Sequence, residues 1–279
     1  MNLVIDIGNT LTKVATFEGD QVRDVWAGPY AQAPQAIGAL IKAKTFEAAI
    51  VSTVQHKQGE VPDDLLFLQR EGLKVITARH DLPLPITIRY DTPETLGVDR
   101  IASAVAGNFF FPDEAVLIIN TGTCLTTDLV SAKGEYLGGT ISPGLQMRLN
   151  ALHHYTGNLP LIDHSTHFFN REDPLRPSAH HPGPKPPSVS TKTNELISKA
   201  SSSNLPATST HDAMLFGVTL GMIAEIDGLI AAYQKNISFF NVILSGGDIN
   251  FFDKKLKNRI FAVENIVLHG LNQMMIHNA

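Results

Sequence analysis

The sequence has very little cysteine, because Cys124 is the only one among 279 residues. A single thiol excludes an internal disulfide framework and fits a reducing compartment. Charge is also sparse, at 18% of residues, and the formal net charge is −5. No basic cluster or stripe is present. The sequence therefore lacks the features of a protein that binds nucleic acid or an anionic membrane surface.

Targeting and membrane segments are also missing from the pattern. No basic and apolar leader precedes the first predicted strand, and we expect no apolar run of membrane-spanning length. These absences favour a cytoplasmic protein. The length, with 43% hydrophobic residues, allows one large domain or two of ordinary size.

A short motif occurs twice, once in each half of the chain. The first copy surrounds Asp6 and Gly8, and the second surrounds Asn120 and Gly122. Each copy has an apolar run, a carboxylate or its amide, a glycine among small polar residues, and a second β-prone run. This order predicts a strand, a tight hairpin and a strand, with the glycine supplying a positive φ. Backbone N–H groups at such turns bind anions, so two facing turns predict a nucleotide's phosphates held between related halves.

Strand and helix signals alternate along both halves, which predicts an α/β duplication. A joint at 112–114 suggests two domains, 1–112 and 113–279. The segment 163–207 is rich in Pro and Ser and is predicted to be mostly loop, with a short helix at 194–199. The predicted strands are 3–7, 11–17, 22–26, 48–52, 73–77, 134–139 and 241–244, and the predicted helices are 34–44, 63–70, 99–109, 145–152 and 210–233.

The first turn carries residues suited to phosphate chemistry. Asp6 can hold Mg²⁺ through water, the turn amides can bind phosphate oxygens, and Lys13 can place a cation against the same charge. The alternative is an Asx-type turn, in which Asp6 and Asn9 bond only to their own backbone.

A second candidate site is the segment Gly97-Val98-Asp99-Arg100, at a loop-to-helix junction. Asp99 can be a simple helix N-cap. It can equally accept a proton from a hydroxyl group, while Arg100 offers a forked donor to an anionic substrate. The pattern alone leaves both interpretations open.

Two glycine-rich segments are weaker candidates. Gly138 to Gly144 is predicted to be a corner between a strand and a helix, and Ser245 to Asp248 follows a buried strand. Each is either a plain loop or a place where backbone approaches a ligand closely. The pair His153-His154 has no zinc-ligand spacing, so we expect no structural metal there. Cys124 is expected to be a small buried residue rather than a nucleophile.

Taken together, these segments resemble the type III pantothenate kinases, members of the acetate and sugar kinase, Hsp70 and actin superfamily. The resemblance covers nearly the whole chain apart from the Pro-rich segment. The matching segments are 6–10, 90–100, 120–123, 138–144, 157–160, 210–214, 246–247 and 268–271.

The resemblance implies a duplicated two-domain actin-like (ribonuclease H-like) α/β fold, with a nucleotide cleft between the domains. It implies ATP-dependent phosphorylation of pantothenate to 4′-phosphopantothenate, the first step of coenzyme A biosynthesis. ATP with Mg²⁺ would be the phosphoryl donor, and the protein would be a homodimer. By analogy Asp99 is the general base, and the substrate site comprises Tyr90, Gly97, Val98, Asp99, Arg100 and Thr210. Thr210 would be offered across the dimer interface. The ATP site comprises Asp6, Ile7, Gly8, Asn9, Thr10, Leu11, Thr12, Lys13 and Thr123.

One departure from the family pattern concerns Asn120. Family members usually carry Asp there, at a position associated with a monovalent cation, K⁺ or NH₄⁺. An amide can still donate an oxygen to the cation but brings no negative charge, so the sequence leaves cation dependence open. Two other hypotheses remain, a non-catalytic nucleotide-binding regulator of the same family and a related kinase with a sugar as acceptor. The Asn120 substitution favours the regulator, while Tyr90 and the 97–100 segment argue against the sugar kinase.

Overall fold

The chain folds around two β-sheets, and the structure, a computed structural model, describes residues 1–53, 60–163, 205–252 and 255–279. The first sheet consists of β1 (Asn2–Ile7), β2 (Thr12–Glu18), β3 (Gln21–Gly28), β4 (Ala48–Thr53) and β5 (Lys74–Thr77). The second consists of β6 (Thr87–Ile88), β7 (Val116–Thr121), β8 (Cys124–Val130), β9 (Glu135–Pro143), β10 (Asn241–Ser245) and β11 (Phe261–Ala262).

The two sheets share one construction. Their strand orders are β3-β2-β1-β4-β5 and β11-β10-β7-β8-β9-β6. In the first sheet, β1 pairs antiparallel with β2 and parallel with β4. In the second, β7 pairs antiparallel with β8 and parallel with β10. This repetition confirms the predicted α/β duplication.

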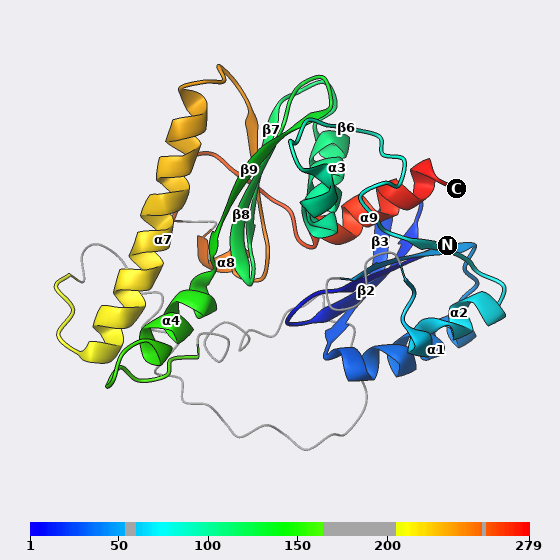
Figure 1. Cartoon of the computed structure of the whole chain (residues 1–279), viewed down its shortest axis with the longest axis horizontal. Coiled ribbons are helices and arrows are strands. Elements are labelled where there is room, and N and C mark those ends of the chain that lie inside the picture. The colour runs from blue at the N-terminus through cyan, green and yellow to red at the C-terminus, as the bar shows by residue number, and fades with distance from the viewer. Residues whose placement is uncertain (54–59, 164–204, 253–254) are drawn as a thin grey trace.

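Two helices, α3 (Val98–Phe110) and α9 (Ile266–His277), lie between the sheets (Figure 1). Helix α9 packs against β1 and β4, whereas α3 packs mainly against β7 and β8. The two helices approach closely because Gly270 has no side chain. A Cβ atom there would lie 1.7 Å from the carbonyl oxygen of Ala102. One buried cluster therefore runs from Val4 in the first sheet to Ile118 in the second.

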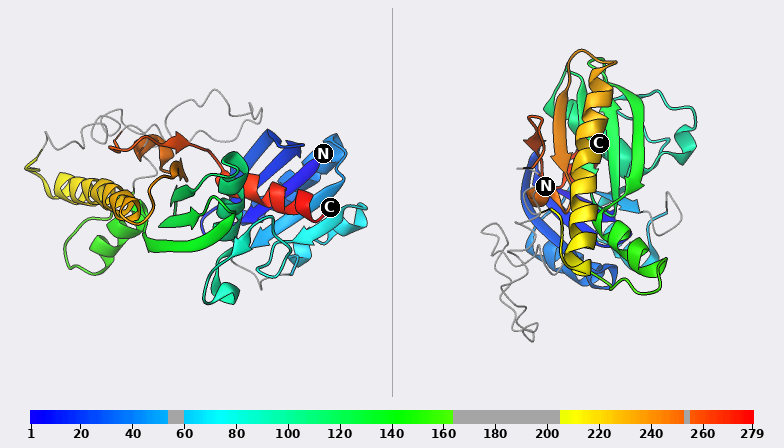
Figure 2. Two further views of the ribbon diagram at one scale, coloured as in Figure 1. Left: turned by 90° about the horizontal axis from the view of Figure 1, so that it is seen from above. Right: turned by 90° about the vertical axis from the view of Figure 1, so that its left-hand side faces the viewer.

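The remaining helices cover the outer faces of the sheets. Beside the first sheet are α1 (Ala33–Ala43), α2 (Phe67–Arg70) and the 3₁₀ turns η1 (Tyr30–Gln32) and η2 (Asp63–Leu65). Beside the second are α4 (Leu145–His154), α7 (Thr210–Gln234) and α8 (Ile249–Phe252). Figure 2 shows the resulting succession of layers, with α7 at one end of the molecule. A third 3₁₀ turn, η3 (Pro93–Thr95), precedes α3.

The predicted division between residues 112 and 113 stays a prediction. Strand β6 comes before it, yet pairs with β9 of the second sheet. Helix α9 comes after it, yet packs on the first sheet. Each half therefore contributes one element to the layer of the other half.

Helix α7 corrects the expectation about membrane-spanning length. By length and composition alone it is apolar enough to cross a membrane, but core helices of soluble proteins pass the same test. Its buried side, including Met222 and Ile226, packs against Leu117 and Ile119 of β7. Only 44% of its most apolar stretch is buried within this chain, so much of the helix surface is uncovered.

Most predicted elements are confirmed within one or two residues, with two local differences. The predicted helix at 63–70 is split into η2 and α2. The predicted corner at Gly138 to Gly144 is wrong, because β9 continues to Pro143 and α4 begins at Leu145. The predicted helix at 194–199, and nearly all of the predicted loop at 163–207, lie outside the described residues.

Candidate active site

The two repeated turns face each other and touch. The hydroxyl oxygens of Thr10 and Thr123 lie 3.0 Å apart, at hydrogen-bonding distance. The first turn is closed by a hydrogen bond from Gly8 N–H to the carbonyl oxygen of Leu11, and the second by one from Gly122 N–H to that of Cys124. The two hairpins that sequence similarity relates thus meet at one point of the structure.

The predicted positive φ at these glycines is wrong, because neither Gly8 nor Gly122 is among the glycines with positive φ. Space explains Gly8 instead, since a Cβ atom there would lie 3.0 Å from the carbonyl oxygen of Leu11. The second turn is crowded from another side. A Cβ atom on Gly144, at the start of α4, would lie 2.2 Å from the carbonyl oxygen of Gly122.

A small cavity of about 50 Å³ lies behind the two turns. It is lined by the ends of β1, β2, β7 and β10 and by the first turn of α9. Its polar lining residues are Asp6, Lys13, Asn120, Ser245 and Asn265. A cavity at the carboxyl ends of β1, β7 and β10 is a typical position for a ligand in an α/β protein.

The charges of this cavity are strongly perturbed. Burial and, after it, the charge of Asp99 raise the pKa of Asp6 to about 6, while Lys13 and Ser52 oppose the shift. Burial lowers the pKa of Lys13, whose ammonium group donates to the side-chain oxygen of Asn265 at 2.9 Å. A carboxylate and an ammonium group held at a desolvation cost are typical of a functional site.

These residues fit a nucleotide and its Mg²⁺. A divalent cation would restore the ionised form of Asp6, because an adjacent positive charge lowers a carboxyl pKa. The lysine and the turn amides suit phosphate oxygens. On the opposite turn, the half-buried Asn120 offers only a neutral amide.

Asp99 occupies the first turn of α3 and is not its N-cap, since that position belongs to Gly97. The Asp99 carboxylate accepts a hydrogen bond from its neighbour's backbone, the N–H of Arg100, at 3.0 Å. It lies so close to Gly97 that a Cβ atom there would come within 2.5 Å of Oδ1. Its charge raises the pKa of both Asp6 and Asp128.

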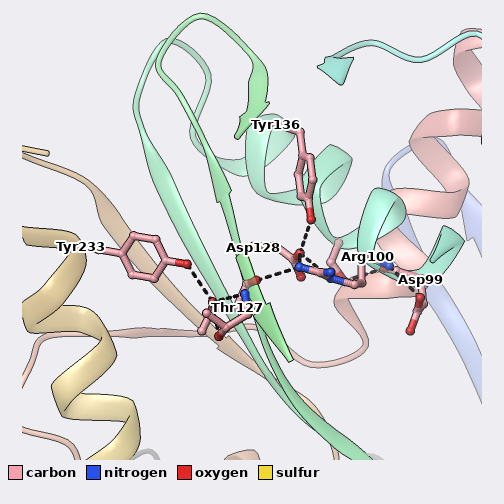
Figure 3. A network of polar contacts seen from close by, with 8 residues as sticks. Asp99, Arg100, Thr127, Asp128, Tyr136 and Tyr233 are labelled. Atoms are coloured by element: carbon pink, nitrogen blue, oxygen red, sulfur yellow. Dashed lines mark hydrogen bonds and ion pairs between the residues drawn. The ribbon is translucent and has the colours of Figure 1, made fainter. Parts of the chain in front are cut away.

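The guanidinium group of Arg100 is not free to bind an anionic substrate, as the sequence predicted, but is held within the protein. Its Nε and Nη2 atoms each lie 2.8 Å from Oδ1 of Asp128 on β8, and Nη2 also donates to the carbonyl oxygen of Thr127 (Figure 3). The hydroxyl group of Tyr136 donates to the same Asp128 oxygen at 2.8 Å. Burial raises the pKa of Asp128 to about 6, against the effect of Arg100, so the carboxyl is ionised and paired at neutral pH.

Tyr90 and Thr210, both predicted to bind the substrate, have different surroundings. The Tyr90 ring packs against that of Tyr136, with centroids 5.9 Å apart, which joins it to the Asp128 network. Thr210 is the first residue of α7 and is exposed. Figure 1 shows α7 and α3 on opposite sides of the second sheet.

Sequence reasoning assigned no role to Asp128, Tyr136 and Asn265. Asp128 had a usable signal, because a lone carboxylate inside an apolar strand requires a buried partner. Asn265 is one of two non-glycine residues with positive φ among the described residues. No local sequence pattern indicates the positive φ of Asn265, and the contact of Asn265 with Lys13 spans 252 positions.

Solved structures show which fold this chain shares. The chain aligns with a protein named as an N-acetylmannosamine kinase from Listeria monocytogenes at a TM-score of 0.51, 12% identity and 99% coverage of both chains. It aligns with a protein assigned to the Baf family of transcriptional activators from Campylobacter jejuni at a TM-score of 0.53 and 18% identity, over 99% of this chain and 98% of the other. These similarities confirm the predicted actin-like fold, which small-molecule kinases share.

Sequence comparison then identifies the family. Residues 2–173 match the family model described as type III pantothenate kinase. A type III pantothenate kinase from Bacteroides fragilis is 37% identical over all of this chain and 98% of its own length. One from Phocaeicola vulgatus is 34% identical over all of this chain and 99% of its own. The chain belongs to the type III pantothenate kinase family.

Proposed function

We propose that this chain transfers the γ-phosphoryl group of ATP to the primary hydroxyl group of pantothenate, which yields 4′-phosphopantothenate and ADP. This is the first step of coenzyme A biosynthesis, and we place it in the cytoplasm. The observation that carries the proposal is the contact between Thr10 and Thr123, which joins the two turns over a cavity holding Asp6 and Lys13. Family membership identifies the acceptor.

In this proposal the ATP phosphates lie on residues 6–13 and Thr123. Mg²⁺ near Asp6 neutralises charge on the transferred group when bound. Lys13 places a cation on the same phosphates, and Asn265 holds the ammonium group in position at 2.9 Å. Because phosphoryl transfer depends mainly on positioning and charge neutralisation, this set of groups is sufficient.

Asp99 is the proposed base. Its carboxylate accepts the hydroxyl proton as the alcohol oxygen bonds to the γ-phosphorus, and the bond from that phosphorus to the β,γ-bridging oxygen breaks. Tyr90 and the 97–100 segment line the pantothenate pocket. Since the guanidinium of Arg100 is bound to Asp128, Arg100 serves this pocket through its backbone and through the position of α3.

The direct test is release of ADP by the purified chain with Mg-ATP, with and without pantothenate, followed by mass analysis of the product. We expect saturable, pantothenate-dependent ADP release. N-acetylmannosamine and glucose serve as alternative acceptors. Turnover of a sugar instead would point to a different kinase, and ATP binding without turnover of any acceptor would point to a regulator.

We further propose that Asn120 holds a monovalent cation, K⁺ or NH₄⁺, only weakly. Its amide oxygen is a possible ligand, but it carries no net charge to offset the cation's lost hydration. The same assay with K⁺ or NH₄⁺ in place of a large organic cation is expected to show activation that saturates only at high salt.

The proposed active form is a homodimer that uses the uncovered side of α7. A line of small residues is exposed along the whole helix, namely Ala213, Gly217, Gly221, Ala224, Gly228 and Ala231. A Cβ atom on any of the three glycines would meet nothing within 4 Å, so this chain's own packing does not need them. Glycine inside a helix costs about 0.5–1 kcal/mol relative to alanine. Close approach of a second α7 explains why they are there, and it would offer Thr210 to the partner.

Sedimentation of the Gly221→Leu variant tests this interface. We expect a monomer with a raised KM for pantothenate. The matched control is Gly38→Leu in α1, another helical glycine with nothing within 4 Å, which is expected to leave the dimer intact. A Gly221→Leu variant that stays dimeric would contradict the proposed interface.

A further inference from the structure

The buried polar network between α3 and the second sheet connects both ends of the proposed substrate pocket. Asp128 Oδ1 accepts from Arg100 and from the hydroxyl group of Tyr136. Arg100 directly follows Asp99, and the Tyr136 ring packs on Tyr90. The network therefore contacts the proposed base on one side (Figure 3) and, through Tyr136, the ring of Tyr90 on the other.

We infer that Asp128 and Tyr136 are positioning residues for phosphoryl transfer, which fix the first turn of α3 and thereby the Asp99 carboxylate. This inference rests on the proposed function. Arg100 is the connection, since its backbone N–H donates to Asp99 while its guanidinium group is held by Asp128 and by the carbonyl oxygen of Thr127. The next turn of α3 is tied to the same residue, because the Ser103 hydroxyl donates to the Asp99 carbonyl oxygen.

Burial makes this anchor rigid. Asp128 and Tyr136 have no exposed surface, and Arg100 is 6% exposed. Removing Arg100 or Asp128 alone would leave a buried charge unpaired, which is far more costly than breaking a surface ion pair. Strand β9 also makes room for the guanidinium group, because a Cβ atom on Gly139 would lie 3.1 Å from Arg100 Nη2 and 1.6 Å from the carbonyl oxygen of Thr127.

The polar network also extends from strand β8 away from α3, toward α7 and β9. Thr127 Oγ1 lies 3.0 Å from the hydroxyl group of Tyr233 on α7 and 2.8 Å from that of Thr140 on β9. Strand β8 is thereby fixed from both faces. A displacement of about 1 Å in a catalytic group can cost about 100-fold in rate, so an anchor of this kind affects turnover more than binding.

The geometry of Asp128 permits a graded set of variants. Both its partners bond to Oδ1, while Oδ2 is buried and has no hydrogen-bond partner among the described residues. In Asp128→Asn, an amide oxygen can replace Oδ1, and the amide nitrogen then takes the position of Oδ2. The buried guanidinium group of Arg100 then lacks its counter-charge, so we expect a lower thermal midpoint, with kcat kept within about fivefold in the folded variant. Tyr136→Phe, which removes one of the bonds, is expected to lower kcat by about threefold to tenfold.

The decisive variant removes the whole pair. In Arg100→Met with Asp128→Leu, no buried charge is left unpaired, so folding is expected to survive. We expect a thermal midpoint close to that of the parent, unchanged KM for ATP, and a kcat lowered by about 10- to 100-fold. The matched control is Asp24→Asn, an aspartate bound by Lys44 and by Thr16 on the first sheet, which is expected to leave kcat unchanged.

The outcomes separate this inference from the proposed function. A parent chain that does not phosphorylate pantothenate defeats the proposed function. An active parent whose folded double variant keeps parental kcat overturns the positioning role, as does a loss confined to the KM for ATP. Should the double variant not fold, Tyr136→Phe decides, because an unchanged kcat in that folded variant also overturns the inference.

Discussion

The two turns that meet at Thr10 and Thr123 share one backbone plan and differ in charge. The first carries Asp6 and Lys13, and burial shifts the pKa of both toward the neutral form. The second carries Asn120 and Thr123, which are uncharged. The hairpin geometry is thus common to both halves, while the costly electrostatics lie in one of them. Duplication supplied two similar turns, and only the first retains the charged groups that phosphate chemistry needs.

Making the first turn as neutral as the second is expected to have the largest effect on activity. Asp6→Asn removes the carboxylate of the proposed phosphate site, and we expect kcat to fall by about 100- to 1,000-fold. Steady-state turnover of ATP with pantothenate measures this loss. A variant with more than one-tenth of parental kcat would show that the charge difference between the turns is not functional.

The same substitution is expected to stabilise the ligand-free protein. Since the pKa of Asp6 is raised from 3.8 to about 6, the folded state binds more protons than the unfolded state between these values. The free energy of unfolding therefore falls as pH rises through this range, by about 3 kcal/mol. Asp6→Asn lacks this loss, so the variant should gain on the parent from pH 4 to 7 in urea titrations.

Asp24→Asn is the control with the opposite sign. The hydrogen bond from Lys44 holds the pKa of Asp24 below its usual value, so that carboxylate stabilises the fold once it is ionised. Replacing Asp24 should lower the free energy of unfolding at pH 7 and change it little at low pH. The loss should be small, because the ion pair is partly exposed. Equal pH dependence in the parent and Asp6→Asn would contradict the burial of the Asp6 charge.

Adding a charge to the second turn tests the difference between the turns in the opposite direction. Asn120→Asp is expected to lower the K⁺ concentration for half-maximal activation by about tenfold, because a carboxylate attracts a cation that an amide only solvates. Titration of activity with KCl at constant ionic strength measures this. An unchanged K⁺ requirement would exclude residue 120 as a cation ligand.

The smallest expected effect concerns the contact between the turns. Thr123→Val removes one hydroxyl group and leaves the backbone amides in place. We expect a rise of about twofold to tenfold in the KM for ATP with kcat nearly unchanged, the size of one lost hydrogen bond. Ser131→Ala, at the remote turn between β8 and β9, is the control and should change neither parameter.

Local sequence patterns predicted most strands and helices well, but they predicted the long-range contacts between these elements poorly. The strands on either side of Gly8 and Gly122 follow from apolar runs interrupted by small polar residues, and both hairpins form as expected. The prediction of a positive φ at Gly8 was wrong. The lack of space for a Cβ atom beside the Leu11 carbonyl oxygen, rather than the turn type, explains why glycine occupies this position. The corner expected at 138–144 became a strand because β9 pairs with β8 along its whole length, up to Pro143 opposite Cys124.

The candidate site divides in the same way. Asp6, Lys13 and Thr123 belong to local motifs, so the sequence could indicate them. The partner of Arg100 could not be read locally, because Asp128 is 28 positions away, on strand β8 of the second sheet. Asn265 is still more distant from Lys13, and its role follows only from where α9 begins. Long-range pairs of this kind depend on tertiary packing, which no window of sequence contains.

Single turnover with the Asp99→Asn variant tests the central claim most directly. The variant keeps the side-chain volume and one oxygen but cannot take up the hydroxyl proton. We expect unchanged ATP affinity, a thermal midpoint near that of the parent, and phosphoryl transfer to pantothenate slowed at least about 1,000-fold. Transfer at near-parental rate in the folded, ATP-bound variant would contradict the account.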